Sequence, residues 1–501
     1  MTDVAPATDA KLPPPTNTED AKLEQFGYTQ KLDRSVGKLA SFALGFATIS
    51  ATTAVFTGFG AGYFTAGGPF VWTLLLAAAV FLIWTFLAAD LTAKIPLAGY
   101  AYQWTSRIHG SMMAFFTGVL ALAGWVCGMT GVGFILSGYL GSLFGWNMNQ
   151  TAQILVAIGV MGVCVLVNLY GVRFATMVNN IGVSLELVVT VGATLLVAII
   201  AFSSPANHQP VSVLFTGGTA DEHSAYILAW LAASLGPFFG LIGVEASADI
   251  AEETVNARRV IPRTMFYALT ASIVIEFLMY VVYVLAIKDA AAVENASAAP
   301  IEEIITQQAG PVVAQIVVAV ALTNVMACIL ANILVATRLT YSMARDNMLP
   351  FSHVWRHVSA SNRTPTYAVL GLYGLSTILL LSALVSEKAF FLIIGLSSLA
   401  VCSMYFLQTV AVLVGSRRGT IPAAEPGTFD LGRFRVPVAI VALLAFAGVC
   451  AALIFLPQFA GNGYVFAGLV ALAALWAATG LRKRLANGEA GPNYAKTHLH
   501  A

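Results

Sequence analysis

The sequence predicts an all-α, polytopic membrane protein with twelve transmembrane helices. Of its 501 residues, 58% are hydrophobic and 10% are charged, and the mean hydropathy is +0.81. Because soluble domains carry about 25% charged residues, this chain has too few charges to cover a water-facing surface of its own size. It also contains many apolar runs near or above the roughly 18–20 residues that cross a bilayer core. Its Lys and Arg residues gather in alternate loops, which is typical of multi-span proteins.

Apolar runs bounded by polar residues or by Gly/Pro turns mark the predicted spans. The ninth and tenth spans are separated only by Ser386, Glu387 and Lys388, so that boundary is the least defined. The twelve spans lie near residues 40–64, 70–93, 112–142, 151–171, 180–202, 225–247, 265–287, 312–335, 366–386, 388–414, 436–456 and 463–481.

The distribution of positive charge orients these spans. With both termini on one side, all of the 25 Lys and Arg residues except Lys288 and Lys388 fall on that side. Basic residues favour the cytoplasmic face, so we expect both termini in the cytoplasm and the protein in a bacterial-type inner or plasma membrane. The five cysteines all lie in apolar spans without CxxC spacing, which predicts buried thiols rather than disulfides or metal ligands.

The chain divides into five predicted segments. Residues 1–35 are polar and Pro-rich without a signal-peptide core, and we expect a disordered cytoplasmic tail. Residues 36–202 form a first five-helix repeat, 203–414 a second, inverted one, and 415–481 two peripheral helices. Residues 482–501 form a second cytoplasmic tail.

The inverted repeat rests on interruptions at matching places in spans one and six. Span one crowds hydroxyl residues between Thr48 and Thr57, and span six carries Gly236-Pro237, further glycines up to Gly243, and Glu245. Broken helices survive in lipid only where protein or a polar cavity covers the break. Paired breaks point to a transporter with a site at mid-membrane, where half-helix ends meet the substrate. The glycines of GFGAG, Gly58 to Gly62, instead favour close helix packing.

Four stretches carry a resemblance to a known family. They are FFGLIGVEASADIAEETVNARRVIPR from Phe238, ADLTAKIPLAGYAYQWTSRIHG from Ala89, RLTYSMARDNMLP with NRTPTYAV from Arg338, and, more loosely, GWVCGMTG from Gly124. They resemble the signatures of the amino acid–polyamine–organocation (APC) superfamily over about residues 36 to 480. The FTGFG…GGP pattern of span one favours its amino acid/choline, γ-aminobutyrate permease-like branch. The resemblance implies a five-plus-five, LeuT-like inverted repeat working by alternating access.

The resemblance also implies which residues bind substrate. The unwound part of span one would receive the substrate carboxylate, Phe239 would form an aromatic gate, and the unwound part of span six would meet the amine. The chain departs from the family's G-S/A-G pattern at Thr53-Ala54-Val55, so a hydroxyl of Thr52 or Thr53 is a substitute for bare backbone. The implied binding residues are Ile49, Ser50, Ala51, Thr52, Thr53, Ala54, Val55, Gly128, Phe238, Phe239, Gly240, Ile242, Gly243 and Asn332.

Three acids at membrane depth are candidates for coupling, because ionisable groups are costly there. Glu186 is either a proton-coupling carboxylate or a counter-charge for a substrate amine, with a neutral, hydrogen-bonded structural role as the alternative. Glu245 matches an acid that the resemblance links to proton-linked gating, with structural pairing to a polar neighbour as the alternative. For Glu276, which matches no motif, we expect a satisfied structural role.

The charged continuation of span six predicts an inner gate. We expect Asp249, Glu252 and Glu253, with Arg258, Arg259 and Arg263, to form a solvated helix end with salt bridges that are individually weak. Asp90 with Arg107, and Arg345 with Asp346, suit the same role.

These observations favour a secondary transporter over a channel, a receptor or an enzyme. We expect an amino acid or related amine as substrate, proton-coupled symport, and exchange without ion coupling or sodium symport as alternatives. The acids near the site favour a cationic amine, and a neutral aliphatic amino acid remains open. No cofactor, metal site or nucleic-acid contact is expected: His353 and His357 lack a third ligand, and the basic residues are spread over the inner segments. Monomer and homodimer remain open.

Overall fold

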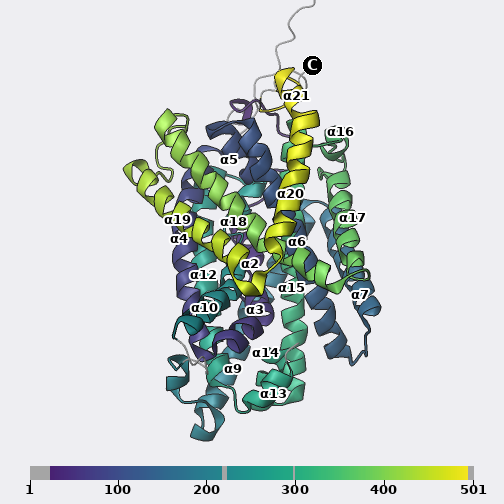
Figure 1. The fold of residues 1–501 in the computed structure, drawn as a ribbon. Coiled ribbons are helices and arrows are strands. Elements are labelled where there is room, and N and C mark those ends of the chain that lie inside the picture. The colour runs from purple at the N-terminus through teal and green to yellow at the C-terminus, as the bar shows by residue number, and fades with distance from the viewer. Residues whose placement is uncertain (1–22, 217–222, 297–298, 493, 495–501) are drawn as a thin grey trace, which may run out of the picture.

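The described chain is a bundle of helices (Figure 1). The computed structural model describes residues 23–216, 223–296, 299–492 and 494. Within these ranges there is no strand, and the only strand-like pairing is a single parallel bridge between Val36 and Thr254. The predicted all-α fold is confirmed.

The α-helices and their bounds follow the chain order. They are α2 (Lys38–Ile49), α3 (Ala51–Ala66), α4 (Thr73–Lys94), α5 (Tyr100–Ile108), α6 (Ser111–Phe144), α7 (Gln150–Leu169), α8 (Val172–Leu185), α9 (Val191–Phe202), α10 (His223–Ala233), α11 (Leu235–Gly240), α12 (Ala257–Leu285), α13 (Ala290–Asn295), α14 (Pro300–Ala309), α15 (Pro311–Arg345), α16 (Ser352–Trp355), α17 (Thr366–Ser382), α18 (Glu387–Arg418), α19 (Arg435–Phe455), α20 (Asn462–Trp476) and α21 (Arg482–Ala486).

Ten helical stretches in the described part are long and apolar enough to cross a membrane. Two shorter apolar helices, Tyr226–Gly240 and Thr366–Ser382, lie where the sixth and ninth spans are predicted. The total of twelve spans stays a prediction, as does the inverted repeat. Helices of spans five, seven and eight extend beyond the apolar runs, because their polar flanking residues continue the helix.

The first span is broken at Ser50. Helix α2 ends at Ile49, α3 begins at Ala51, and Ser50 between them has φ 34° and ψ 91°. A non-glycine residue rarely takes positive φ, and such strain gathers at functional sites. The predicted unwound stretch of residues 49–55 is therefore too long, because Ala51 to Val55 already belong to α3.

The sixth span is broken between α11 and a 3₁₀ helix, Ala246–Glu253. The break covers residues 241–245, and Gly243 has φ 98°. The sequence alone predicts the break at residues 236–243, and the family resemblance implies unwound backbone at residues 240–243. Gly236 to Gly240 are helical, so the break begins later than the wider range and overlaps the narrower one.

Glycines bring α3 and α11, one half of each broken span, into contact. A Cβ on Gly236 of α11 would lie 3.0 Å from the Gly58 carbonyl oxygen of α3, and a Cβ on Gly58 would lie 3.3 Å from Gly236 Cα. The predicted packing role of Gly58 is confirmed. Side chains larger than hydrogen would force the two half-helices apart.

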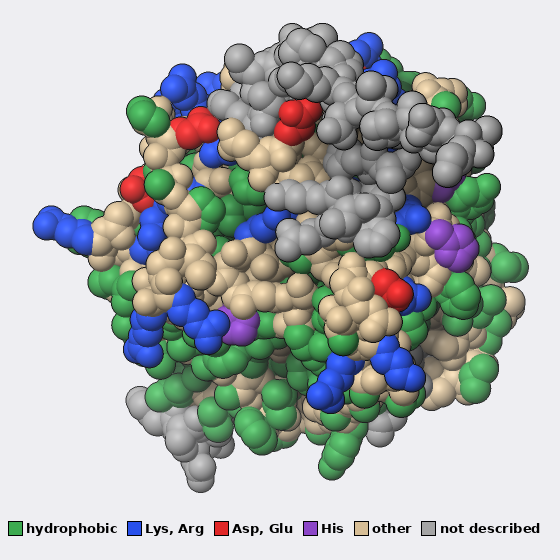
Figure 2. Space-filling model, turned by 90° about the horizontal axis from the view of Figure 1, so that it is seen from above, with side chains coloured by type: hydrophobic (Ala, Val, Ile, Leu, Met, Phe, Trp, Pro, Cys, Tyr) green, Lys and Arg blue, Asp and Glu red, His purple; other side chains and the backbone are tan. Residues whose placement is uncertain are grey.

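Buried ion pairs close the end of the bundle that holds both described ends of the chain. Glu253 pairs with Arg338 at 2.8 Å and Glu252 with Arg345 at 2.8 Å, joining the 3₁₀ helix of span six to α15. All four side chains are at most 5% exposed, so the expected solvated helix end is wrong. Arg258 pairs with Glu425 instead. Figure 2 looks onto this end and shows Lys and Arg side chains spread around its rim.

Residues 23–35 differ from the expected disordered tail. The Tyr28 hydroxyl donates to Asp346 Oδ1 at 2.9 Å, and the Arg345 guanidinium lies 3.5 Å from the centre of the Tyr28 ring. Leu32 is fully buried. This segment therefore packs over the same ion pairs, while residues 1–22 of the predicted tail lie outside the described residues.

Asp90 has other partners than the expected Arg107. It pairs with Lys94 on its own helix and with Arg435 at 2.7 Å. Lys94 also pairs with Asp430 at 2.7 Å, and this hydrogen bond holds the pKa of the Asp430 carboxyl well below its usual range. The cluster attaches α4 to the start of α19.

We expect Gly236→Val to destabilise the folded protein by about 1–3 kcal/mol, the usual cost of overpacking. The matched control is Gly159→Val on α7, where the exposed glycine has nothing within 4 Å of an added Cβ. Thermal unfolding of the purified protein in detergent measures both. Equal melting temperatures for the two variants would contradict the close contact.

Arg338→Met leaves the buried Glu253 carboxylate without its partner, and we expect a loss of about 3–5 kcal/mol in the free energy of unfolding. The double variant Arg338→Met/Glu253→Gln removes both charges and should recover part of that loss. Unfolding in detergent of the wild type and the two variants measures it. A double variant no more stable than the single one would show that charge pairing is not the cause.

Candidate functional site

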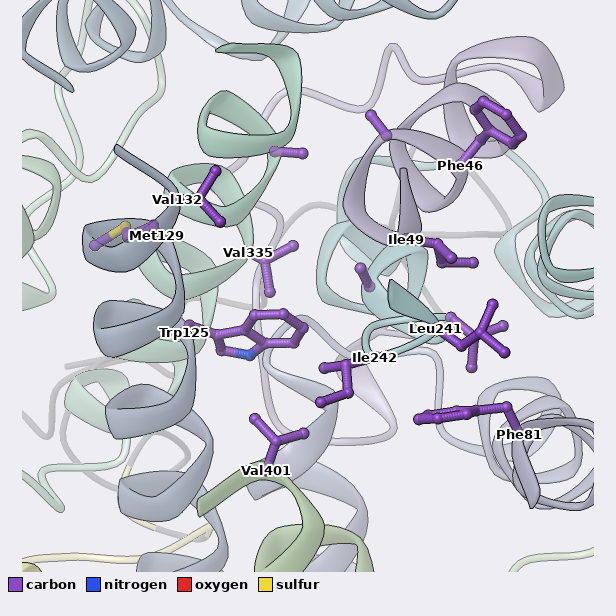
Figure 3. Close-up of a cluster of buried hydrophobic side chains, with 14 of the residues drawn as sticks. Phe46, Ile49, Phe81, Trp125, Met129, Val132, Leu241, Ile242, Val335 and Val401 are labelled. Carbon is purple, nitrogen blue, oxygen red and sulfur yellow. The ribbon is translucent and has the colours of Figure 1, made fainter. Parts of the chain in front are cut away.

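A small cavity lies between the broken spans and helices α6, α15 and α18. Its volume is about 30 Å³, which is room for about one water molecule. Figure 3 shows a cluster of buried hydrophobic side chains in this region, with the Trp125 ring between Val335, Ile242 and Val401; of the labelled residues, Ile49, Trp125, Val132, Ile242 and Val401 line the cavity. The residues that line it are Thr48, Ile49, Thr53, Ala54, Gly124, Trp125, Gly128, Val132, Phe239, Gly240, Ile242, Cys328, Asn332, Ser397 and Val401.

The structure divides the predicted binding residues into two groups. The cavity lining includes Ile49, Thr53, Ala54, Gly128, Phe239, Gly240, Ile242 and Asn332. The lining does not include Ser50, Ala51, Thr52, Val55, Phe238 and Gly243. Phe238 points elsewhere, with its ring 4.7 Å from that of Phe81 on α4. Glu186 and Glu245 also lie outside the lining, each bonded to an element that forms it.

Glu186 binds the break in the first span. The Thr52 backbone N–H donates to Glu186 Oε1 at 3.1 Å, and the Ser50 hydroxyl donates to the same oxygen at 3.3 Å. The Ser50 hydroxyl oxygen also accepts the Thr53 N–H at 3.1 Å. The first turn of a helix has no internal partners for its N–H groups. Here Ser50 and Glu186 supply them, and the Glu186 side chain is only 2% exposed.

A π-helical turn aims Glu186 at that position. It covers Glu186–Thr190, between α8 and α9. Such turns often mark functional sites. The same turn brings the Thr190 hydroxyl within 3.0 Å of the Thr52 hydroxyl, so two of its side chains contact the amino end of α3.

The break in the sixth span depends on Gly243. A Cβ there would lie 2.6 Å from Thr48 Cγ2 and 2.9 Å from Trp125 Cη2. Its N–H donates to the Tyr405 hydroxyl at 3.3 Å, and that hydroxyl donates to Glu245 Oε1 at 2.8 Å. Tyr405 thus ties the unwound backbone to Glu245.

Glu245 is fully buried and held by three donors. Besides Tyr405, the Tyr100 hydroxyl donates to Oε1 at 2.5 Å and the Trp84 indole N–H donates to Oε2 at 2.9 Å. The arrangement suits a fixed anchor for the broken helix.

Glu276 lies against the end of α11 without a well-formed hydrogen bond. It is fully buried, and both of its carboxyl oxygens and the Tyr280 hydroxyl one turn along lack a partner among the described residues. Its Oε1 lies 2.9 Å from where a Gly240 Cβ would stand. The expected satisfied structural role stays a prediction, because the Tyr280 hydroxyl faces the carboxyl group but their geometry is not that of a well-formed hydrogen bond.

Sequence reasoning missed most of the cavity wall formed by α6 and α18. The clearest case is Trp125, 4% exposed, whose indole nitrogen has no hydrogen-bond partner among the described residues. The quoted GWVCGMTG stretch contains it, three residues before Gly128 and so on the same helix face. Val401 and Ser397 reach the site because Gly124 and Gly128 let α18 approach: Cβ atoms there would lie 2.2 and 2.9 Å from Val401 Cγ2 and Ser397 Oγ.

The charges around the cavity are all of one kind. No Lys, Arg or His is among its described lining residues, and Glu186 and Glu276 each contact one of the broken spans. Among the described residues, no group of three His, Cys, Asp or Glu is placed to hold a metal ion. The arrangement offers helix ends, aromatic faces and carboxyl groups to a small molecule.

Comparison with known proteins gives one family. The profile of the amino acid permease family matches residues 37–476. An amino-acid permease BAT1 homolog from Oryza sativa is 26% identical over 475 residues, covering 88% of this chain and 88% of that protein. The branched-chain amino acid permease BcaP of Bacillus subtilis is 26% identical, with 77% and 81% covered. The polyamine transporter TPO5 of Saccharomyces cerevisiae is 26% identical, with 86% and 72% covered.

The broken first and sixth spans, the buried site between them and a profile match over most of the chain agree, and this multi-pass membrane protein belongs to the amino acid permease family of the APC superfamily.

Proposed function

We propose that this chain is a permease that carries an amino acid or a related amine across the membrane by alternating access, coupled to proton symport. The similar proteins are named as permeases of amino acids, among them branched-chain amino acids, and as polyamine transporters. A carrier role rather than an enzymatic one follows from the family. In the proposed orientation both termini lie in the cytoplasm, which the Lys and Arg distribution supports.

The contact of Glu186 with the broken first span carries the coupling proposal. A carboxyl group at membrane depth changes its charge at high free-energy cost unless its surroundings change with it. Glu186 accepts hydrogen bonds from Thr52 and Ser50, so movement of α2 against α3 alters its partners. Protonation of Glu186 is therefore coupled to movement of the hinge between α2 and α3, which also opens the site.

The two ends of the site differ in how they are closed. At the end that holds the termini, the buried Glu252–Arg345 and Glu253–Arg338 pairs join span six to α15. Towards the other end, the glycine contact between α3 and α11 holds the half-helices together. Alternating access separates one of these contacts at a time, which leaves the substrate accessible from one side only.

Glu186→Gln should abolish accumulation driven by a pH gradient while leaving exchange between equal pools, because glutamine keeps the acceptor on Thr52 but carries no exchangeable proton. Uptake of radiolabelled amino acids and amines into proteoliposomes, acidic outside and without sodium, measures accumulation. Counterflow at equal pH measures exchange.

The control is Glu294→Gln on α13, an exposed acid outside the site. A Glu186→Gln variant that still accumulates substrate with the wild-type pH dependence would remove Glu186 as the coupling group. Wild-type uptake that ignores the pH gradient but needs sodium, or needs substrate inside, would favour the two alternatives of sodium symport and exchange.

Tyr405→Phe should slow both accumulation and counterflow and lower stability by about 1–3 kcal/mol, because it leaves the buried Gly243 N–H without an acceptor and removes one donor from Glu245. The matched control is Tyr373→Phe, whose hydroxyl donates only to the Ile158 carbonyl on α7. Thermal unfolding and transport assays of the two variants test it. Wild-type transport in Tyr405→Phe would show that this bond does not support the hinge.

A further inference from the structure

The amino end of α3 is already occupied by a carboxyl group of the chain itself. An unobstructed helix amino end offers N–H groups and a positive dipole to an anion, and this is how a half-helix would hold a substrate carboxylate. Here Glu186 accepts the Thr52 N–H and the Ser50 hydroxyl accepts the Thr53 N–H. The Ala54 N–H makes the ordinary first intrahelical bond to the Ser50 carbonyl. Two of the three N–H groups that lie before it in α3, those of Thr52 and Thr53, are therefore taken.

Nothing else around the cavity compensates a negative charge. Its described lining contains no Lys, Arg or His. Among the described lining residues, the one side-chain donor without a hydrogen-bond partner is the Trp125 indole N–H, which is neutral and suits a hydroxyl or carbonyl oxygen. An unpaired carboxylate in such an apolar site carries a large desolvation cost.

The other broken span offers the opposite chemistry. Helix α11 ends at Gly240 with its carbonyl groups and the negative end of its dipole towards the break. The carbonyl oxygens of Leu241 and Ile242 have no donor among the described residues. Glu276, whose contact with the Tyr280 hydroxyl is not a well-formed hydrogen bond, lies directly behind Gly240. Trp125 and Phe239 line the same cavity, and aromatic rings attract cations to their faces.

We propose that this site takes a cationic amine that lacks a carboxylate, with Glu186 excluding the carboxylate and the end of α11 with Glu276 attracting the ammonium group. The proposal rests on the proposed transport function. It holds in either protonation state of Glu186, because a neutral carboxyl group still occupies the Thr52 N–H. The cavity must open to admit the amine, since its present volume fits about one water molecule.

Pairs of molecules that differ only by the carboxylate test this choice in the wild-type protein. The pairs are leucine with isoamylamine, lysine with cadaverine, and arginine with agmatine. Proteoliposome uptake and mutual competition are measured for each pair. We expect the amine of at least one pair to have a half-saturation concentration lower than that of its amino acid by about tenfold or more.

Two results would overturn the proposal in different ways. If each amino acid is carried as well as its amine or better, the carboxylate is accepted and the inference fails while the transport function stands. If neither member of any pair is carried, and none competes with another amine or amino acid, the proposed function fails and the inference with it.

Two variants at one position assign the selectivity to Glu186. Glu186→Ala frees the Thr52 N–H. Within each pair, the uptake of the amino acid relative to that of its amine should therefore be higher than in the wild type. Glu186→Gln keeps an acceptor oxygen there, so it should continue to exclude the carboxylate. Both are compared with Glu294→Ala, and their folding is checked by thermal unfolding and gel filtration. Equal selectivity in the Ala and Gln variants would show that occupation of the Thr52 N–H does not exclude the carboxylate.

Discussion

The interaction on which the site depends is the satisfaction of broken backbone inside the membrane. Lipid offers no hydrogen-bond partners, so each interrupted helix needs donors and acceptors from the protein. At the first break Ser50 and Glu186 supply acceptors for the amino end of α3. At the second break the Tyr405 hydroxyl accepts the Gly243 N–H and donates to Glu245. The acids of the site are thus part of its architecture as well as candidates for its chemistry.

Close packing around the breaks follows from the same need. Gly58 and Gly236 let α3 and α11 touch, and Gly243 admits Trp125 and Thr48 against the unwound turn. Side chains at these positions would open gaps beside backbone that cannot be hydrated. Beyond the second break, Glu252 and Glu253 meet Arg345 and Arg338 in a buried seal, so the hinge and the closure belong to one continuous segment. Motion at residues 241–245 would therefore change the shape of the cavity and the buried ion pairs at the same time.

The elements themselves were well predicted, since long apolar runs with polar borders leave few alternatives for helices in lipid. The broken spans were predicted from Gly-Pro and hydroxyl clusters. Their limits were not, because Ala51 to Val55 remain helical once Glu186 and Ser50 complete their first turn. The gate acids were expected in solvent, yet Glu252 and Glu253 are buried by arginines that lie more than 80 residues away. Residues 23–35 have the composition of a tail, and their contacts with distant residues, among them Arg345, Asp346 and Glu252, hold them on the bundle.

The sequence by itself determined the environment, the helical class, the two breaks and the acids worth attention, because each follows from local composition and spacing. Only the tertiary structure decided what those acids face. Glu186 meets a backbone N–H 134 residues away, and Glu245 meets three donors from α4, α5 and α18. Glu276 faces the Tyr280 hydroxyl of its own helix without a well-formed hydrogen bond. Such pairings depend on how distant helices pack, and packing depends on shape at contacts like Gly58–Gly236, which no single stretch of sequence contains.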